Sequence, residues 1–206
     1  MKKYGLAIHT TSPELGLAIS DFSENVRAVK YDLGLELSAY LHQYLQEFII
    51  PQTWQDLEFI AVAKGPGSFT ATRIGMVTTR TLAQQLEIPL FAISSLKAFA
   101  WQEKERLENN NSLIAVQMEA RRNQIFVAIY EPFKAGLQDY LSDSTMTLAT
   151  WQATLNNLEK NYQLIATPTN LGHTATSLLE LAHLDRQLGN NPDWRSALPF
   201  YGQKPV

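Results

Sequence analysis

The residues with the clearest potential for chemistry form a glycine-rich turn, Lys64-Gly65-Pro66-Gly67-Ser68-Phe69-Thr70, placed between an apolar run and a helix-period run. Gly65 and Gly67 permit backbone angles that other residues resist, and Pro66 fixes its own φ angle. Ser68 and Thr70 are both candidate N-caps for the helix that follows. Because the N-terminus of a helix attracts negative charge, this turn could cradle an anion such as a phosphate.

The turn departs from the known phosphate-binding patterns, however. A phosphate loop ends in Gly-Lys-Ser/Thr, whereas Lys64 comes before the turn here. The dinucleotide-binding pattern needs a third glycine, which this turn lacks. The residues alone therefore favour a structural turn over a nucleotide site.

Other side chains give little support to catalysis. None of the four histidines has a partner at metal-ligand spacing, so neither a metal nor another cofactor is expected. His9, at the end of the first predicted strand, could act as a base, whereas His42 is expected to have a structural or interface role. Glu119-Ala120-Arg121-Arg122 is either a charged turn or an anion site, and the turn is the favoured interpretation. The sequence has no Gly-x-Ser-x-Gly elbow and no cysteine, so it supports neither an esterase triad nor thiol chemistry.

The composition is that of an ordinary globular protein. The 206 residues are 45% apolar and 18% charged, with a formal net charge of -3, which suits one large domain or two small ones. No basic patch typical of nucleic-acid binding is visible, so any contact with RNA is expected to be indirect, through a partner. No apolar run is long enough for a signal-peptide core or a membrane span, so a cytoplasmic location without membrane contact is predicted.

The elements that position these residues follow from hydrophobic periodicity. Helices are predicted over residues 37–49, 70–86, 96–106, 151–158 and 174–188, and strands over residues 4–10, 15–20, 26–33, 57–63, 88–93, 113–118, 124–130, 140–148 and 163–166. Asn109-Asn110-Asn111-Ser112 is the predicted linker, because Asn and Ser side chains compete with helical hydrogen bonds. The prediction is therefore two α/β halves, residues 1–108 and 109–206, and the last segment could pack back on the first half.

The helix over residues 70–86 is unusually rich in small side chains. Gly75 lies in its middle, where glycine costs roughly 1 kcal/mol relative to alanine, and close approach of another helix is the usual reason. With the helix over residues 37–49 it could form a surface for self-association or a partner, although both helices could instead pack only on their own sheet. The candidate interface residues are Leu37, Ser38, Leu41, His42, Leu45, Thr70, Arg73, Ile74, Val77, Thr78 and Thr81.

Several motifs in this order resemble the TsaB family. The resemblance is dense over residues 59–96, where it rests on Gly65-Pro66-Gly67-Ser68-Phe69-Thr70, Arg73-Ile74-Gly75, Ile88-Pro89-Leu90 and Ser94-Ser95-Leu96. The opening Ala7-Ile8-His9-Thr10-Thr11 resembles the family's first strand and turn, while Ala120-Arg121-Arg122 and Pro199-Phe200-Tyr201 resemble later motifs. Thr10 and Thr11, with Gly65, Gly67 and Ser68, are the candidate contacts for an anion or nucleotide.

The resemblance implies a short actin/Hsp70/sugar-kinase-like α/β fold with two lobes and mixed sheets. It further implies a non-catalytic subunit that binds the TsaD transferase, which adds a threonylcarbamoyl group to an adenosine of certain tRNAs. TsaB-like proteins are expected to dimerise when alone, to use the N-terminal lobe for both contacts, and to join an assembly with the TsaE ATPase.

The chain departs from the family pattern at four positions. His9 stands where the family usually has Asp, and Glu119 also replaces an Asp. Ala71 and Thr72 replace a Gly-Leu pair, which could reshape the helix contact. A carboxylate at the first of these positions helps catalytic relatives to hold metal and phosphate, so its absence argues against an ATPase.

Two other readings remain. The chain could be an enzyme of the same fold, either a small ATPase or kinase or a glycoprotease-like peptidase. The missing carboxylate and the lack of a visible nucleophile–base pair speak against both activities. It could also be a chaperone-like clamp for some other protein.

Overall fold

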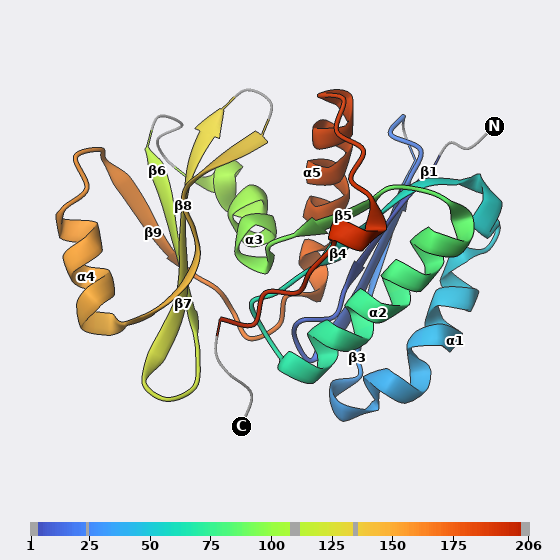
Figure 1. Cartoon of the computed structure of the whole chain (residues 1–206), viewed down its shortest axis with the longest axis horizontal. Coiled ribbons are helices and arrows are strands. Elements are labelled where there is room, and N and C mark those ends of the chain that lie inside the picture. The colour runs from blue at the N-terminus through green and yellow to red at the C-terminus, as the bar shows by residue number, and fades with distance from the viewer. Residues whose placement is uncertain (1–3, 24, 108–111, 134–135, 203–206) are drawn as a thin grey trace.

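The computed structural model describes residues 4–23, 25–107, 112–133 and 136–202, which form two lobes built on separate sheets (Figure 1). The first sheet has the order β3-β2-β1-β4-β5 and consists of β1 (Tyr4–His9), β2 (Glu14–Ser20), β3 (Val26–Asp32), β4 (Leu57–Ala63) and β5 (Leu90–Ile93). Its first three strands form an antiparallel meander, while β4 runs parallel to both β1 and β5.

The second sheet has the order β8-β7-β6-β9. It consists of β6 (Leu113–Glu119), β7 (Gln124–Phe133), β8 (Gly136–Thr147) and β9 (Tyr162–Ala166). Strands β6, β7 and β8 are antiparallel, and β9 pairs parallel with β6. The two α/β halves predicted from the sequence are present, and both sheets are mixed, as the resemblance implies.

The helices are α1 (Leu37–Ile49), α2 (Phe69–Leu86), α3 (Ser95–Glu103), α4 (Leu148–Asn156) and α5 (Ala175–Gln187). Short 3-10 turns occur at Gly34–Glu36, Trp54–Asp56, Lys104–Arg106, Gly172–Thr174 and Trp194–Ser196. The helix predicted to reach Arg106 therefore ends at Glu103 and continues as a 3-10 turn, and β5 begins at Leu90 rather than Ile88.

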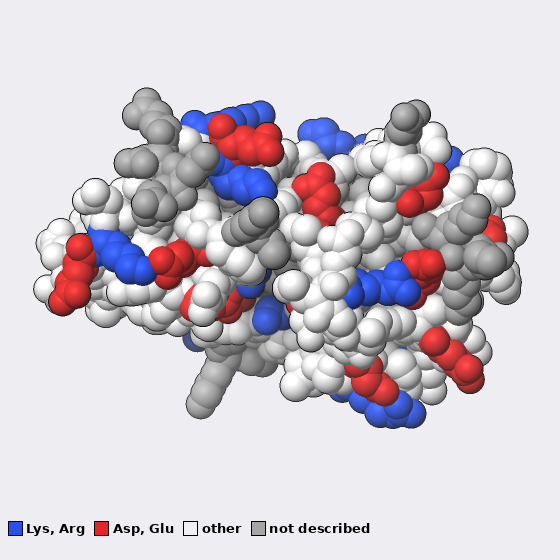
Figure 2. Space-filling view, turned by 90° about the horizontal axis from the view of Figure 1, so that it is seen from above, with Lys and Arg blue, Asp and Glu red and all other residues white. Residues whose placement is uncertain are grey.

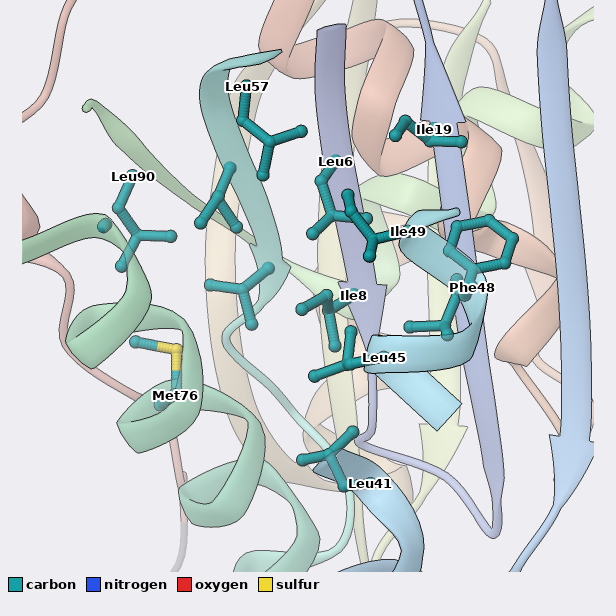
Figure 3. Packing of buried hydrophobic residues seen from close by; sticks show 14 of the residues in the cluster. Leu6, Ile8, Ile19, Leu41, Leu45, Phe48, Ile49, Leu57, Met76 and Leu90 are labelled. Carbon is teal, nitrogen blue, oxygen red and sulfur yellow. The ribbon is translucent and has the colours of Figure 1, made fainter. Parts of the chain in front are cut away.

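Helices cover both faces of the first sheet. Leu6 and Ile8 of β1 pack under α1 and α2 in the largest core cluster (Figure 3), whereas Ala7, between them, faces α5. This alternation follows from the strand geometry, in which successive side chains point to opposite faces. Burial on both faces explains why β1 and β4 are almost continuously apolar.

The last part of the chain returns to the first lobe. Helix α5 contacts β1, β2 and β4, and the backbone N–H of Leu90 donates to the carbonyl of Pro192 over 3.2 Å. Helix α3 contacts strands of the second sheet as well as α5, so it lies where the lobes meet. Of the predicted linker only Ser112 is among the described residues, and the boundary at residue 108 stays a prediction. None of the described helices is both long and apolar enough to cross a membrane.

Candidate partner-binding face and interlobe cleft

The glycine turn is packed tightly by the protein's own backbone. Gly65 has a φ of 103°, and a Cβ added there would lie 2.2 Å from the carbonyl oxygen of Phe200. A Cβ at Gly67 would lie 2.2 Å from the carbonyl oxygen of Thr11, to which the N–H of Ser68 donates over 2.8 Å. Both glycines are therefore required by contacts within the chain, and Gly65 is not available to an anion.

The hydroxyls of Thr10 and Thr11 are buried and engaged in internal hydrogen bonds. Thr10 Oγ1 donates to the carbonyl of Ala71 over 2.9 Å, which ties the end of β1 to the first turn of α2. Thr11 Oγ1 lies 2.8 Å from Ser95 Oγ, which ties the same segment to α3. These bonds make the two threonines part of the packing between strand and helices, and Thr10 does not line the cleft described below.

Gly75 owes its place in α2 to the same contact. A Cβ at Gly75 would lie 2.2 Å from Thr10 Oγ1, so only glycine lets the helix come this close to the end of β1. The sequence-based interpretation, that this glycine marks the approach of another helix at an interface, is wrong. The close approach is made within the chain.

Helix α3 has a side-chain cap, whereas the two predicted N-caps of α2 make no capping bond. Ser94 Oγ accepts hydrogen bonds from the N–H groups of Leu96 and Lys97 and so caps α3. Ser68 is the N-cap residue of α2, but its side chain makes no capping bond, and Thr70 lies inside the helix. The first turn of α2 therefore depends on other contacts for its support.

His9 occupies a dry position at the end of β1. Burial, with a smaller contribution from the nearby His173, lowers the pKa of His9 to about 3. Its Nε2 lies 3.3 Å from Thr11 Oγ1, while Nδ1 has no hydrogen-bond partner among the described residues. The imidazole is thus neutral at physiological pH, and it does not open onto the cleft where a base would meet a substrate.

Three predicted interface residues of α1 belong to the core of their own chain. Leu37, Leu41 and Leu45 are at most 4% exposed and belong to the largest core cluster. Figure 3 shows Leu41 and Leu45 on the side of α1 that faces the first sheet. Assigning them to an interface was wrong, since no partner can reach them without displacing α1. Ser38 and His42 are exposed on the outer side of this helix.

The residues predicted on α2 divide in the same way. Thr78 is buried and offers no free surface, and Ile74 is half-buried against the core, so only part of its side chain is open to solvent. Thr70, Arg73, Val77 and Thr81 are exposed, and Val77 keeps 63% of its surface open to solvent. Since α1 and α2 lie side by side on the first lobe (Figure 1), we group the predicted interface positions that are exposed on them as one candidate surface. We call this surface the α1–α2 face, and it comprises Ser38, His42, Thr70, Arg73, Val77 and Thr81.

A cleft of about 950 Å³ lies between the glycine turn and the second lobe. Thr11, Gly67 and Ser68 line one side, and the turn between β6 and β7 lines the other with Arg121 and Arg122. Arg122 and Asn123 have φ angles of 60° and 54°, which is the geometry of a tight hairpin turn. The segment is thus a charged turn, as favoured from the sequence, and it also faces a cleft that the sequence did not reveal.

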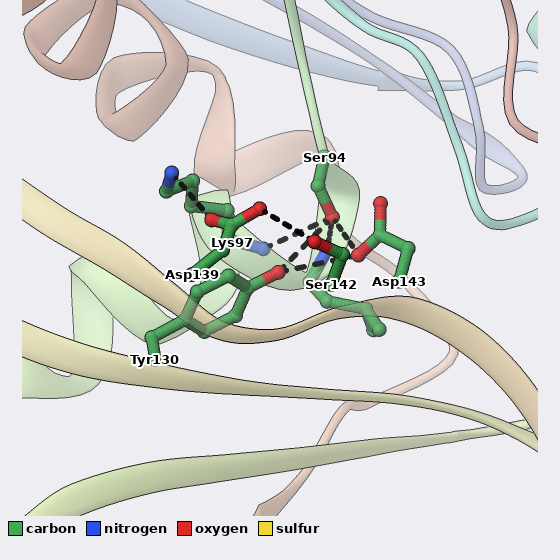
Figure 4. A network of polar contacts seen from close by, with 7 residues as sticks. Ser94, Lys97, Tyr130, Asp139, Ser142 and Asp143 are labelled. Carbon is green, nitrogen blue, oxygen red and sulfur yellow. Dashed lines mark hydrogen bonds and ion pairs between the residues drawn. The ribbon is translucent and has the colours of Figure 1, made fainter.

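A partly buried polar network joins the lobes at a second place (Figure 4). Ser94 Oγ donates to Asp143 Oδ1 over 2.7 Å, and the Tyr130 hydroxyl lies 3.2 Å from the same oxygen. Burial raises the pKa of Asp143, and burial together with Asp143 raises that of Tyr130. The sequence did not reveal this network, because Tyr130 and Asp143 lie far along the chain from Ser94.

The chemistry within reach of these groups is limited. Among the described residues, no three His, Asp or Glu side chains are grouped so that they could hold a metal ion. The cleft brings two guanidinium groups near a helix N-terminus, an arrangement that could hold an anion, but Glu119 lies in the same lining. The α1–α2 face, by contrast, presents mainly small polar side chains to solvent, together with Arg73, His42 and the apolar Val77.

Comparisons with known proteins point to one family. The family model for TsaD, tRNA N6-adenosine threonylcarbamoyltransferase, matches residues 37–181. The chain is 31% identical to the tRNA threonylcarbamoyladenosine biosynthesis protein TsaB of Bacillus subtilis over 81% of its own length and 72% of that protein's. It is 26% identical to the protein of the same name in Buchnera aphidicola from Acyrthosiphon pisum, over 60% of this chain and 57% of that one.

Solved structures show the same fold. YeaZ from Pseudomonas aeruginosa superposes with a TM-score of 0.77 at 19% identity, covering 96% of this chain and 100% of that chain. A second crystal structure from the same organism, described as similar to the peptidase YeaZ, gives a TM-score of 0.79 over 98% of this chain and all of the other.

Proposed function

Since the chain belongs to the TsaB family, we propose that it is a non-catalytic subunit of the system that forms threonylcarbamoyladenosine in tRNA. Its role is to bind and activate a TsaD-like transferase. The observation that carries this proposal is the α1–α2 face, a set of exposed side chains on two adjacent helices whose inner sides are fixed by the core. Such a preorganised surface loses little conformational freedom on binding.

The make-up of the α1–α2 face suits a protein partner. Its side chains are mostly small, so a second helix could approach closely, and Val77 supplies an exposed apolar anchor. Arg73 adds a guanidinium that can bind a carboxylate in a forked geometry. The same face would serve a homodimer when the protein is alone, so self-association and transferase binding would compete.

Two further contacts belong to this proposal. A TsaE-like ATPase joins the assembly, and tRNA is reached through the transferase rather than directly. Basic and acidic side chains are interspersed on the face seen in Figure 2, without a broad area of positive charge of the kind that follows a phosphate backbone. A cytoplasmic location follows from the substrate of the system.

The absence of catalysis is part of the proposal and has its own support. The position where catalytic relatives would place a carboxylate holds His9, which is buried and neutral. The hydroxyls of Thr10 and Thr11, which could contact a phosphate, are committed to Ala71 and Ser95. An ATPase, kinase or peptidase would need polar side chains that are free to contact its substrate, and the hydroxyls of Thr10 and Thr11 are not free.

Reconstitution tests the proposal. The purified protein is combined with the TsaD-like transferase and the TsaE-like ATPase of its own organism, the activated carbamoyl donor and unmodified tRNA, and the modified nucleoside is measured. Modification is expected only when this protein is present, and equal modification in its absence would reject the role. ATP hydrolysis by the protein alone, abolished by Thr10→Ala, would instead favour an enzyme.

A further inference from the structure

The chain from residue 192 to residue 202 forms a strap along the flank of α2. It begins where the carbonyl of Pro192 accepts the N–H of Leu90, and near it the Arg80 guanidinium lies 5.9 Å from the Trp194 ring. Ala197 is buried in the core of the first lobe. In Figure 1 the strap, in red, runs beside α2 towards the glycine turn and the second lobe.

The last three described residues of the strap contact three different parts of the molecule. The N–H of Phe200 donates to the carbonyl of Lys64 over 2.7 Å, directly before the glycine turn. The Tyr201 ring packs on the Phe69 ring with 4.4 Å between centroids, at the first residue of α2. The carbonyl of Gly202 accepts from Thr145 Oγ1 over 3.0 Å, on β8 of the second lobe.

The glycine turn is shaped to receive this strap. Gly65 has a φ of 103°, and the carbonyl of Phe200 occupies the space that a side chain at position 65 would need. The Phe200 ring packs on the core of the second lobe, while its backbone is held by the first. The glycine turn thus binds the strap and also leads into α2.

The contact between Tyr201 and Phe69 continues to the exposed surface. The Arg73 guanidinium lies 5.4 Å from the Phe69 ring, so Phe69 connects Tyr201 with a residue of the α1–α2 face. Because Ser68 provides no capping bond, the first turn of α2 lacks the support that a cap usually gives. The aromatic contact supplies support at the same place.

We propose that Tyr201 is a positioning residue, through which the strap holds the first turn of α2 and Arg73 in the orientation that the partner recognises. This inference rests on the proposed function, because it concerns the same α1–α2 face. It assigns a role to residues beyond the matched range 37–181, and it makes partner binding depend on a segment outside the face itself.

Three variants of the full-length protein test the inference. Tyr201→Ala removes the ring, Tyr201→Phe keeps it, and Leu198→Ala is a matched control on the same strap at a side chain that is 65% exposed. One readout is amide hydrogen exchange at Thr72, whose N–H donates to the carbonyl of Ser68 in the first turn. The other is the dissociation constant for the TsaD-like transferase.

In Tyr201→Ala we expect exchange at Thr72 to accelerate about tenfold and binding to weaken about tenfold, while the other two variants behave as the wild type. If Tyr201→Ala fails to fold, Thr145→Val replaces it, because it removes only the hydroxyl that donates to Gly202. Unchanged exchange at Thr72, or faster exchange with unchanged binding, would overturn the inference. A wild type that does not bind the transferase would reject the proposed function, and the exchange result would still decide whether the strap supports α2.

Discussion

Thr10 and Gly75 are in direct contact, although 65 residues separate them: the Thr10 hydroxyl fills the space where a side chain at position 75 would begin, 2.2 Å from an ideal Cβ. Because Thr10 Oγ1 also donates to Ala71, strand β1 and helix α2 are held at a fixed separation. The contact at the end of β1 therefore fixes the position of α2, one of the two helices that carry the α1–α2 face.

Gly75→Ala tests this contact. Alanine favours the helix by roughly 1 kcal/mol, but the new methyl group would overlap Thr10 and force α2 outward, which typically costs about 1 to 3 kcal/mol. We expect a net loss of stability in urea unfolding. Adding Thr10→Ala should recover part of it, and a Gly75→Ala protein more stable than the wild type would contradict the packing described.

Val77→Glu tests the α1–α2 face. Val77 is 63% exposed, so a carboxylate there should leave the unfolding free energy nearly unchanged while it weakens transferase binding at least about a hundredfold. Leu188→Glu, at a side chain that is 60% exposed and directly follows the last residue of α5, is the control and should bind normally. Calorimetric titration with the transferase distinguishes the two.

Leu41→Ala should behave in the opposite way. Leu41 is fully buried under α1, and truncating such a side chain costs about 2 to 5 kcal/mol. We expect lower stability in denaturant unfolding, with binding retained by the protein that remains folded. Loss of binding without loss of stability would show that Leu41 contacts the partner after all.

His9 should make the protein sensitive to acid. Its pKa is about 3 when folded, against 6.5 for the unfolded reference, so between these values the unfolded state binds more protons. Stability should therefore fall as pH decreases from about 6.5 towards 3, with a contribution from this residue of up to about 1.4 kcal/mol per pH unit. Urea unfolding of the wild type and His9→Gln at pH 7 and pH 4.5 measures it, and equal losses in both would reject the assignment.

Asp143 should act with the opposite sign. Burial raises its pKa in the folded state, so its contribution to stability is present at low pH and declines as pH rises through that folded value. Asp143→Asn keeps an acceptor for Ser94 but cannot ionise. Relative to the wild type, its melting temperature should rise with increasing pH, whereas a difference independent of pH would show that Asp143 does not titrate.

The helices and strands could be predicted because each has a local pattern of apolar residues, as in the helical spacing of Leu37, Leu41 and Leu45. The same spacing led to the wrong assignment of these residues to an interface. Periodicity identifies the apolar side of a helix but does not show whether a sheet of the same chain or a partner covers it. Contacts between distant residues were beyond reach. No local sequence pattern indicates that Gly75 contacts Thr10. The same holds for the glycine turn and Arg122, which line one cleft.

The placement of α5 has a consequence for synthesis on the ribosome. One face of the first sheet, lined by Ala7, Ala18 and Ala61, is covered by Leu178 and Leu179 of α5. All five strands of that sheet are made before residue 94, yet the helix that shields them ends at Gln187. At 5–20 residues per second the nascent chain would expose this apolar face for about 5 to 20 seconds, an interval in which a chaperone would be of use.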